Sequence, residues 1–313
     1  MRPPGGTGPS PDAGPPAARP DPPGLGEAGS LPCHLDGRWL PLAEARVHPL
    51  DRGFLFGDGV YEVVKVAGGR LLFLAEHLAR LADGLAALAI ELPGGGERVA
   101  AVCRELASRA GLGDGSLYLQ VTRGAGPREK LPPTGLPPTF FAFPSVHPHA
   151  PHASRGLAAV SQPDVRWGRC DVKSVSLAAT VLGKLAARDA GADEVLFVGP
   201  AGELREGGST NLLVRSAGRL WTHPEGPRIL PGVTRRVLLD AARGLGLQVA
   251  ETAPRLAERA RWDEAILCGT LTGVQALVRL DGEPVGGGRV GEWTRRLGQA
   301  LAEREGPSPS DLC

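Results

Sequence analysis

Two different periods of hydrophobic and polar positions run through the chain, and they predict a mixture of strands and helices. Residues 34–42 (HLDGRWLPL) carry a central Asp-Gly turn between short apolar arms, which is typical of a β-hairpin. Residues 59–74 are β-branched on both sides of a Gly-Gly turn and predict a second hairpin. Apolar residues recur at helical spacing over 75–90 and 98–112, which predicts two helices.

The same mixture continues after a segment rich in proline and histidine. We expect residues 147–155 to link a small N-terminal α/β domain over 33–146 to a larger domain over 156–303. Three histidines invite a metal site, but the intervening prolines and the lack of an acidic neighbour favour a solvated loop. The predicted fold class is α+β. Further strands are expected at 116–124, 139–146, 156–167, 193–198, 211–216, 219–223, 264–270 and 276–286, and further helices at 177–191, 232–246 and 290–305.

The two ends of the chain differ in composition from what lies between them. Residues 1–32 are rich in proline and glycine, and such a stretch cannot bury enough apolar surface to offset the entropy of ordering. We expect a disordered leader there, and it lacks the apolar core of a signal peptide. Residues 304–313 are expected to form a frayed tail.

Composition narrows the classes of function. The net charge is +1 with no basic block, so neither nucleic acid nor an anionic membrane is indicated as a partner. No apolar run approaches the roughly 18 residues that span a bilayer. The five cysteines are scattered without a CxxC pair, which argues against zinc and favours the reducing cytoplasm. No GxGxxG motif follows a predicted strand, so a dinucleotide site is not indicated.

Lysine is rare in this chain: only four of its 35 basic residues are lysine, namely Lys65, Lys130, Lys173 and Lys184. Arginine supplies charge equally well, so a retained lysine is a candidate for chemistry that needs a neutral amine. Lys184 on a predicted helix and Lys65 on a predicted strand are most simply surface residues. Lys130 lies in a loop and could face solvent or bind an anion. Lys173 is expected at a strand end just before a helix, where partial burial would lower its pKa and make it more nucleophilic.

Three other stretches carry complementary chemistry. LREGGSTN places Glu206 among glycines and hydroxyls, in a predicted polar turn. ILPGVTRR puts Val233 and Thr234 at a helix start, where free amides and the helix dipole suit a phosphate, and CGTLTG offers Thr270 after a strand. Each stretch alone is more simply a helix cap or a turn. Together with a nucleophilic lysine, they form the inventory that pyridoxal 5'-phosphate requires.

Residues 33 to 303 resemble the class IV (fold type IV) aminotransferases. The motifs that carry the resemblance follow one another in the family's order: DRGFLFGDGVYEVVKV, EHLARL, DVKS, REGGSTN, ILPGVTR and GEWTRRL. GDGVYEVVKV and VRWGRCDVKS are most similar to the D-amino-acid aminotransferases. The family also includes branched-chain aminotransferases and aminodeoxychorismate lyase. The resemblance implies a larger C-terminal domain built on a β-barrel-like sheet with helices.

The resemblance also implies roles for individual residues. Lys173 would bind the cofactor covalently and, once freed by the amino substrate, move a proton on it. Glu206 would pair with the pyridine nitrogen and keep it protonated. The implied phosphate ligands and their supporting residues are Arg80, Val233, Thr234, Thr270, Ser209 and Thr210.

The substrate side of the implied site contains one departure from the family. Tyr61 would face the substrate, with Val63 on the same side of its strand by the period of two. D-amino-acid aminotransferases usually carry Arg-x-His in a loop that reaches across the homodimer to the substrate carboxylate. Here Arg128 matches the arginine, but Lys130 stands where the histidine is expected. An ammonium can still bind a carboxylate, with a different geometry from a rigid imidazole ring.

The resemblance implies a cytoplasmic, homodimeric transaminase that moves the amino group of an α-amino acid to a 2-oxo acid. A D-amino acid such as D-alanine and 2-oxoglutarate are the expected substrates, in a ping-pong cycle through pyridoxamine phosphate. A branched-chain L-amino-acid aminotransferase and aminodeoxychorismate lyase are the alternatives within the family. A non-catalytic interaction module is the alternative outside it, and the joint presence of Lys173, Glu206 and Arg80 argues against that reading.

Overall fold

The computed structural model describes residues 26–306, and these form two β-sheets with helices packed on them. The strands are β1 Pro32–Leu35, β2 Arg38–Pro41, β3 Gly59–Ala67, β4 Arg70–Leu71, β5 Gly115–Thr122, β6 Thr139–Val146, β7 Gly156–Pro163, β8 Glu194–Val198, β9 Leu204–Gly207, β10 Asn211–Ser216, β11 Arg219–Thr222, β12 Gln248–Glu251, β13 Glu264–Gly269, β14 Gly273–Leu280 and β15 Glu283–Pro284. The α-helices are α1 Arg52–Phe56, α2 Leu74–Ala87, α3 Gly95–Arg109, α4 Ala178–Asp189, α5 Val233–Gly244 and α6 Glu292–Glu305. Short 3-10 helices occupy Gly26–Ser30, Leu42–Glu44 and Leu256–Arg261.

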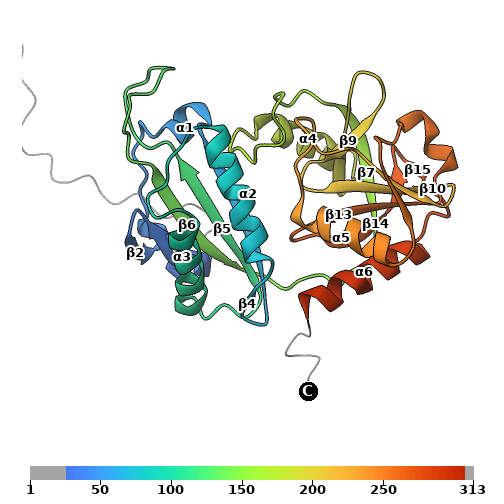
Figure 1. The fold of residues 1–313 in the computed structure, drawn as a ribbon, viewed down its shortest axis with the longest axis horizontal. Helices are drawn as coiled ribbons and strands as arrows, with labels where there is room; N and C mark the ends of the chain where they lie inside the picture. The colour runs from blue at the N-terminus through green and yellow to red at the C-terminus, as the bar shows by residue number, and fades with distance from the viewer. Residues whose placement is uncertain (1–25, 307–313) are drawn as a thin grey trace, which may run out of the picture.

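The first sheet has six strands in the order β2-β1-β6-β5-β3-β4, and every pairing is antiparallel. Figure 1 shows α2 and α3 packed against this sheet on the blue and green side of the molecule. The alternation of β3 explains this layering, because Val60, Val64 and Val66 are buried beneath the helices while Tyr61 and Val63 face the other way. Tyr61 and Val63, which were predicted to face the substrate, therefore lie on the face of the sheet that α2 and α3 leave open.

The second sheet closes on itself. Its main path runs β12-β11-β10-β13-β14-β7-β8-β9, and β9 also pairs with β10, so six of these strands return to their starting point. Closure leaves no free edge between β10 and β9. Helix α4 packs on β7 and β8, while α5 and α6 pack against β13 and β14 (Figure 1). This arrangement confirms the predicted β-barrel-like sheet with helices and the α+β class.

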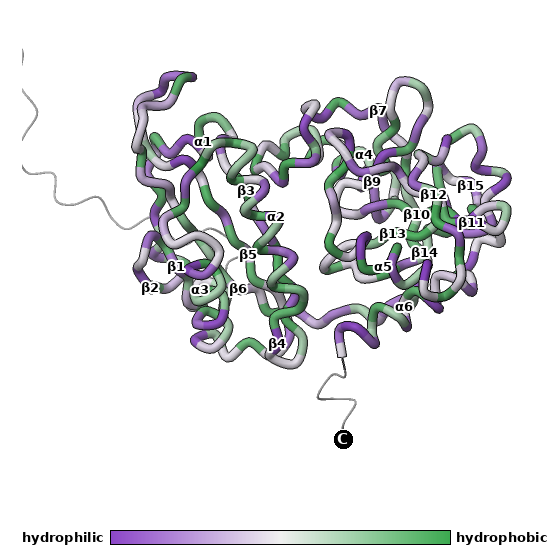
Figure 2. Tube along the Cα trace, in the orientation of Figure 1, coloured by the Kyte–Doolittle hydropathy of each residue, from purple (hydrophilic) through white to green (hydrophobic). Residues whose placement is uncertain are grey.

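Each sheet has its own buried apolar cluster. The first gathers Leu106 and Leu117 with other side chains of α2, α3 and β3–β6, and the second places Leu213, Leu238 and Leu297 between the barrel and its helices. In Figure 2 the hydrophobic colouring follows the strands of both sheets, and the hydrophilic colouring gathers on their connections. Burial of these side chains at about 25 cal/mol per Å² is the main stabilising contribution.

The predicted hairpins, α2, α3, α4, α5 and α6 are confirmed, but the structure adds elements that the pattern did not predict. Helix α1 has only five residues, too few for a helical period to be visible; its N-cap Asp51 accepts a hydrogen bond from the Gly53 amide. Strand β12 was also not predicted. A polar turn was predicted at Glu206, but Glu206 lies on strand β9. Every residue of this short strand is buried in the barrel. The turn begins only after Gly207.

The predicted leader and tail fall partly outside the described residues. Residues 1–25 and 307–313 are not described, while Gly26–Ser30 form a 3-10 helix and α6 continues to Glu305. No helix within residues 26–306 is both long and apolar enough to cross a bilayer.

Each histidine of the 147–155 segment is held at a different place. His147 Nε2 lies 3.0 Å from Ser116 Oγ, and His149 Nε2 lies 2.7 Å from a backbone carbonyl of β3. His152 Nε2 lies 3.1 Å from Glu305 Oε2 at the end of α6. The segment is therefore fixed to the first sheet and to the end of α6 by polar contacts.

Two of the lysines lie in surroundings that the sequence did not predict. Lys65 is buried, and its Nζ is 2.9 Å from Glu305 Oε2, so the surface prediction for Lys65 is wrong. The end of α6 covers this part of β3 and provides the carboxylate that a buried ammonium needs. Lys184 is partly exposed as expected, but its Nζ lies 2.6 Å from Oε1 of the buried Glu194.

Candidate active site

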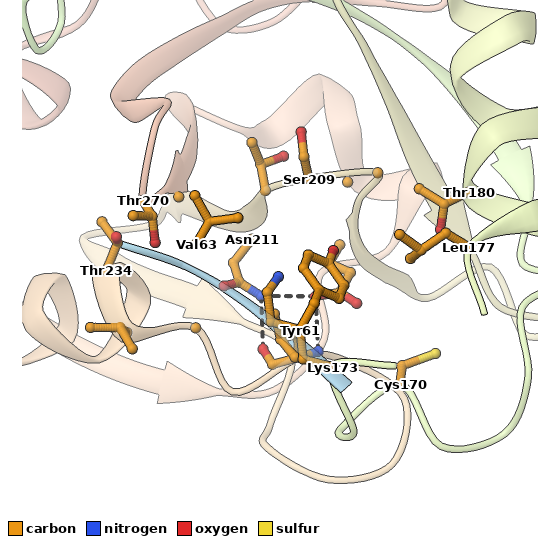
Figure 3. A pocket seen from close by; sticks show the side chains of 18 of the residues that line it. Tyr61, Val63, Cys170, Lys173, Leu177, Thr180, Ser209, Asn211, Thr234 and Thr270 are labelled. Carbon is orange, nitrogen blue, oxygen red and sulfur yellow. Dashed lines mark hydrogen bonds between the residues drawn. The ribbon is translucent and has the colours of Figure 1, made fainter. Parts of the chain in front are cut away.

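A cavity of about 290 Å³ lies between the open face of the first sheet and the barrel. Its lining comes from β3, from the segment before α4, from the turn after β9, from the start of α5 and from the loop after β13. Figure 3 shows Tyr61 and Lys173 together, with Thr234 and Thr270 on one side of the view and Leu177 and Thr180 on the other. Segments that are far apart in sequence thus form a single chamber.

Lys173 enters this cavity from the loop before α4, whereas a strand end was predicted there, since β7 already ends at Pro163. It is partly buried, as predicted. The loop is held against β3, because the Tyr61 amide donates to the Lys173 carbonyl at 3.0 Å and Val60 forms a bridge with Ser174. The ammonium nitrogen lies 4.2 Å from the centroid of the Tyr61 ring. This contact orients the amine over an aromatic face.

Glu206 is buried in the wall of the same cavity, and both of its carboxylate oxygens accept hydrogen bonds. Its Oε1 accepts from Arg166 Nη1 at 2.6 Å, while its Oε2 accepts from Asn211 Nδ2 at 2.9 Å and from the Leu230 amide at 3.0 Å. Burial raises the pKa of Glu206 to about 7, although the charge and hydrogen bond of Arg166 act in the opposite direction. A cation placed beside this carboxylate would therefore be stabilised.

Arg166 is fixed by a second carboxylate. Asp164 accepts from Arg166 Nε at 3.0 Å and from Nη2 at 2.9 Å, and it also accepts from Arg205 at 2.7 Å. Burial acts to raise the pKa of Asp164, but the hydrogen bonds from Arg166 and Arg205 outweigh it and hold the pKa below its usual value. The Arg166 guanidinium also lies over the Phe197 ring at 4.4 Å. Arg166 is thus held in place by Asp164, by the Phe197 ring and by Glu206 itself.

Arg80 reaches the cavity from α2 and is oriented by the buried Glu62. Arg80 Nε and Nη2 donate to the two Glu62 oxygens at 2.7 and 2.9 Å, and Nη1 donates to the Pro231 carbonyl at 3.1 Å. His77 Nδ1 lies 2.9 Å from the same carboxylate. Burial acts to raise the pKa of Glu62, but Arg80 and His77 outweigh it and lower the pKa to about 2. These contacts use three of the five guanidinium N–H groups and leave the others for an anion.

The N-terminus of α5 forms the neighbouring wall. The helix begins after Gly232, which has no side chain to cap its first turn. The first N–H groups of a helix have no intrahelical acceptor, so the amides of Val233 and Thr234 are available to an anion. A Cβ on Gly232 would lie 2.0 Å from Asn211 Oδ1, which accounts for glycine here. Thr270 lines the same end of the cavity (Figure 3).

Ser209 and Thr210 line the cavity, but their hydroxyls are directed to a buried carboxylate. Ser209 Oγ donates to Glu194 Oε2 at 3.1 Å, and Thr210 Oγ1 donates to the same oxygen at 3.2 Å. Val63 and Tyr61 line the opposite wall from β3, next to each other on one face of the strand as predicted. Tyr61 stacks on Tyr118 with ring centroids 5.6 Å apart.

Arg128 and Lys130 do not line this cavity. Both are exposed in the connection between β5 and β6, which projects from the molecule in Figure 1. The buried Arg52 holds this connection by donating to the carbonyls of Glu129 and Lys130 at 2.6 and 3.1 Å. The guanidinium of Arg128 lies 5.9 Å from the Phe56 ring. The structure therefore brings together the predicted cofactor residues with Tyr61 and Val63, but not the predicted carboxylate ligands.

Sequence reasoning missed several residues that shape the cavity, above all Arg166, Asn211, Glu62 and Glu194. Asn211 and Glu62 stand inside the quoted motifs, so their presence was visible although their contacts were not. Arg166 also stands inside a quoted motif, VRWGRCDVKS, seven residues before Lys173, but no local pattern distinguishes it from the other arginines. Only the folded chain shows which polar side chains are buried together.

The donors and acceptors of the cavity fit pyridoxal 5'-phosphate. Arg80 and the α5 amides form an anion site at one end, as a phosphate requires. The buried carboxylate of Glu206 suits a protonated ring nitrogen, and Lys173 places an amine within the same chamber.

Comparisons with known proteins agree with this inventory. The family model described as amino-transferase class IV matches residues 59–280. A D-alanine aminotransferase of Bacillus licheniformis is 36% identical over 269 residues, covering 85% of this chain and 94% of the relative. The structure of a branched-chain aminotransferase from Escherichia coli superposes with a TM-score of 0.79 at 22% identity, covering 87% of this chain and 93% of the other.

A second similar structure is that of an enzyme named for a different reaction. The 4-amino-4-deoxychorismate lyase of Pseudomonas aeruginosa is 33% identical, with a TM-score of 0.73, and covers 87% of this chain and 98% of the lyase. These structural similarities confirm the predicted type IV fold. The chain belongs to the class IV aminotransferases, a family of enzymes that use pyridoxal 5'-phosphate.

Proposed function

We propose that this protein is a transaminase that moves the amino group of a D-amino acid, such as D-alanine, to a 2-oxo acid such as 2-oxoglutarate. The observation that carries the proposal is the single chamber that holds Lys173, Glu206 and the Arg80 anion site. The D configuration is supported by the 36% identity to a D-alanine aminotransferase over most of both chains.

In this proposal the cofactor would supply an electron-withdrawing ring, and the side chains of this protein would attach the cofactor, orient it and move the proton. Lys173 is the covalent attachment point and, when released, is the base that moves a proton between substrate and cofactor. Glu206 holds a proton on the ring nitrogen, and Arg166 and Asn211 hold Glu206 in place. Arg80, the amides of Val233 and Thr234, and Thr270 bind the phosphate, with Ser209 in a supporting position.

The position of Arg128 and Lys130 supports a homodimer. A substrate carboxylate needs a cation, but the free N–H groups of Arg80 are assigned to the cofactor phosphate and Arg166 is paired with Asp164 and Glu206. The exposed loop with Arg128 and Lys130 offers the cations that the chamber lacks, if it enters the chamber of a second copy. Tyr61 and Val63 would then face the substrate from the chain that owns the chamber.

We also propose that residues 33–146 and 156–303 are separate domains and that the enzyme works in the cytoplasm. Each of these two ranges contains its own sheet and most of its own buried cluster. The four described cysteines, Cys33, Cys103, Cys170 and Cys268, are free and buried, which suits a reducing compartment. No nucleic-acid or membrane partner is proposed.

Aminodeoxychorismate lyase activity is the second candidate, because the lyase of Pseudomonas aeruginosa is 33% identical over nearly its whole length. Transamination and cleavage of aminodeoxychorismate are therefore both candidate reactions of the same chamber. They differ in the substrate that the chamber admits, so a substrate screen separates them.

A steady-state screen tests the proposed function directly. D-alanine, L-leucine and aminodeoxychorismate are each supplied with and without 2-oxoglutarate or pyruvate. We expect turnover with D-alanine that requires the 2-oxo acid, and none in Lys173→Arg, which keeps the charge but cannot attach the cofactor. Turnover of aminodeoxychorismate without a 2-oxo acid would support the lyase, and a preference for L-leucine would contradict the D configuration.

Mixing two inactive variants tests the homodimer. Lys173→Arg lacks the attachment point, and a variant with both Arg128→Ala and Lys130→Ala lacks the loop cations. If the loop acts across a two-fold axis, a mixed dimer has one intact chamber, and co-refolded protein should regain about a quarter of wild-type turnover. Lack of any recovery would contradict a loop shared between subunits.

A further inference from the structure

The wall of the chamber formed by residues 207–210 is held by an ion pair that the cofactor chemistry does not use. We propose that Glu194 and Lys184 are positioning residues: together they fix the 207–210 turn and thereby set the affinity for the amino-acid substrate. The inference rests on the proposed transaminase function, since it names what shapes one wall of the same chamber.

Glu194 lies behind the turn at the start of β8, and its side chain is only 4% exposed. Its Oε1 accepts from the Gly208 amide at 3.2 Å, and its Oε2 accepts from the Ser209 amide at 3.4 Å. The hydroxyls of Ser209 and Thr210 donate to Oε2 at 3.1 and 3.2 Å. One carboxylate therefore takes up four donors of a turn of four residues.

These contacts decide what the turn presents to the chamber. Because the donors point back to Glu194, this wall offers few N–H or O–H groups to a substrate carboxylate. The glycines allow the close approach: a Cβ on Gly207 would lie 2.2 Å from Thr210 Oγ1, and one on Gly208 would lie 3.1 Å from Glu194 Oε1. Without the carboxylate, the same donors would be free to turn toward the substrate.

Lys184 connects this arrangement to α4, which also contributes to the lining of the chamber. Its Nζ lies 2.6 Å from Glu194 Oε1, and its Cε would lie 3.1 Å from a Cβ on Gly208, so its stem packs directly on the turn. Lys184 is on α4, the helix whose first turn and preceding residue place Thr180 and Leu177 in the chamber. The ion pair thus joins the 207–210 turn to the helix that carries Thr180.

The physical reason for a lysine here is the charge of a buried carboxylate. An ionised group that is this buried requires an opposite charge in addition to neutral donors. Lys184 supplies that charge from the surface while its side chain remains 39% exposed, so the pair is buried on one side only. Removing either partner loosens the turn without removing any group that binds the cofactor.

Amide hydrogen exchange of the apoprotein tests the positioning directly, independently of any reaction. In Glu194→Gln and in Lys184→Met, we expect the peptide covering 204–211 to exchange roughly 10-fold to 100-fold faster, the range expected for loss of hydrogen bonds to a charged group. Arg188→Met is the matched control, because Arg188 is exposed on the same helix and pairs only with Asp189. Unchanged exchange of this peptide in both variants would overturn the proposal.

Steady-state kinetics test the consequence for the substrate. KM for the amino donor should rise about ten-fold while kcat stays within about two-fold, and the absorption of the bound cofactor should be unchanged. Lys184→Arg keeps the positive charge, so its KM and its exchange rate should stay close to those of the wild type. Lys184→Met provides the test if Glu194→Gln does not fold. If the 204–211 peptide exchanges faster in the variants but their KM is unchanged, the turn does not set substrate affinity. A KM change in Arg188→Met as large as that in Lys184→Met would also refute the link between the turn and the substrate. A wild-type protein without transaminase turnover would overturn the proposed function and leave the exchange result standing.

Discussion

The buried carboxylate of Glu206 should make the stability of the apoprotein depend on pH. Its pKa is raised from the usual 4.5 to about 7, chiefly by burial. Between these two values the unfolded chain has lost the proton and the folded chain keeps it. Stability contributed by the protonated side chain is therefore present below pH 4.5 and is lost as the pH rises toward 7. The pKa difference corresponds to roughly 3 kcal/mol of unfolding free energy.

Glu206→Gln removes this titration and keeps the shape of the side chain. Its amide oxygen can still accept from Asn211 and Leu230, and Arg166 retains its two hydrogen bonds to Asp164. Relative to the variant, the wild-type apoprotein should lose roughly 3 kcal/mol of stability between pH 4.5 and 7 and little above pH 7.

Urea unfolding of cofactor-free protein, followed at several pH values, measures this difference. The difference in unfolding free energy between wild type and Glu206→Gln removes the contribution of all other titrating groups. Glu97→Gln, at an exposed surface position, is the control. In cofactor-loaded protein, a protonated nitrogen beside Glu206 would lower its pKa, so the pH-dependent step should move to lower pH. A wild-type-to-variant difference that is constant from pH 4.5 to 8 would refute the reasoning.

Two further predictions concern buried ion pairs. Glu62→Gln removes the charged partner that orients Arg80, so cofactor binding to apoprotein, titrated by absorbance, should weaken roughly ten-fold, or about 1.4 kcal/mol; unchanged affinity would show that Arg80 needs no such support. Glu305→Gln leaves the Lys65 ammonium buried beside a neutral amide and should lower the urea unfolding free energy by about 3–5 kcal/mol. Adding Lys65→Met should recover most of that loss, and failure to recover would mean that the pair is not the cause.

Local patterns predicted much of the fold correctly. The hairpins and the five long helices follow from turn residues and from periods of 2 and 3.6, because these signals depend only on neighbours in sequence. Helix α1 was not predicted because its five residues are too few to show a helical period. Strands β9 and β12 were not predicted because each has four residues, half or more of them polar or glycine. Glu206 shows the limit of local patterns most directly. The glycines and hydroxyls beside it predicted a turn, but Glu206 itself belongs to a strand of the closed barrel.

The sequence alone identified the groups on which the proposed chemistry rests: Lys173, Glu206, Arg80 and the helix start at Val233 were recognisable by residue type and order. Only the tertiary structure decided how these groups are held. The contacts of Arg166 with Glu206, of Glu62 with Arg80 and of Glu194 with the 207–210 turn join residues between 14 and 40 positions apart. The physical reason is burial, because a charged group removed from water must find its partner across the fold, and no local pattern encodes that partner.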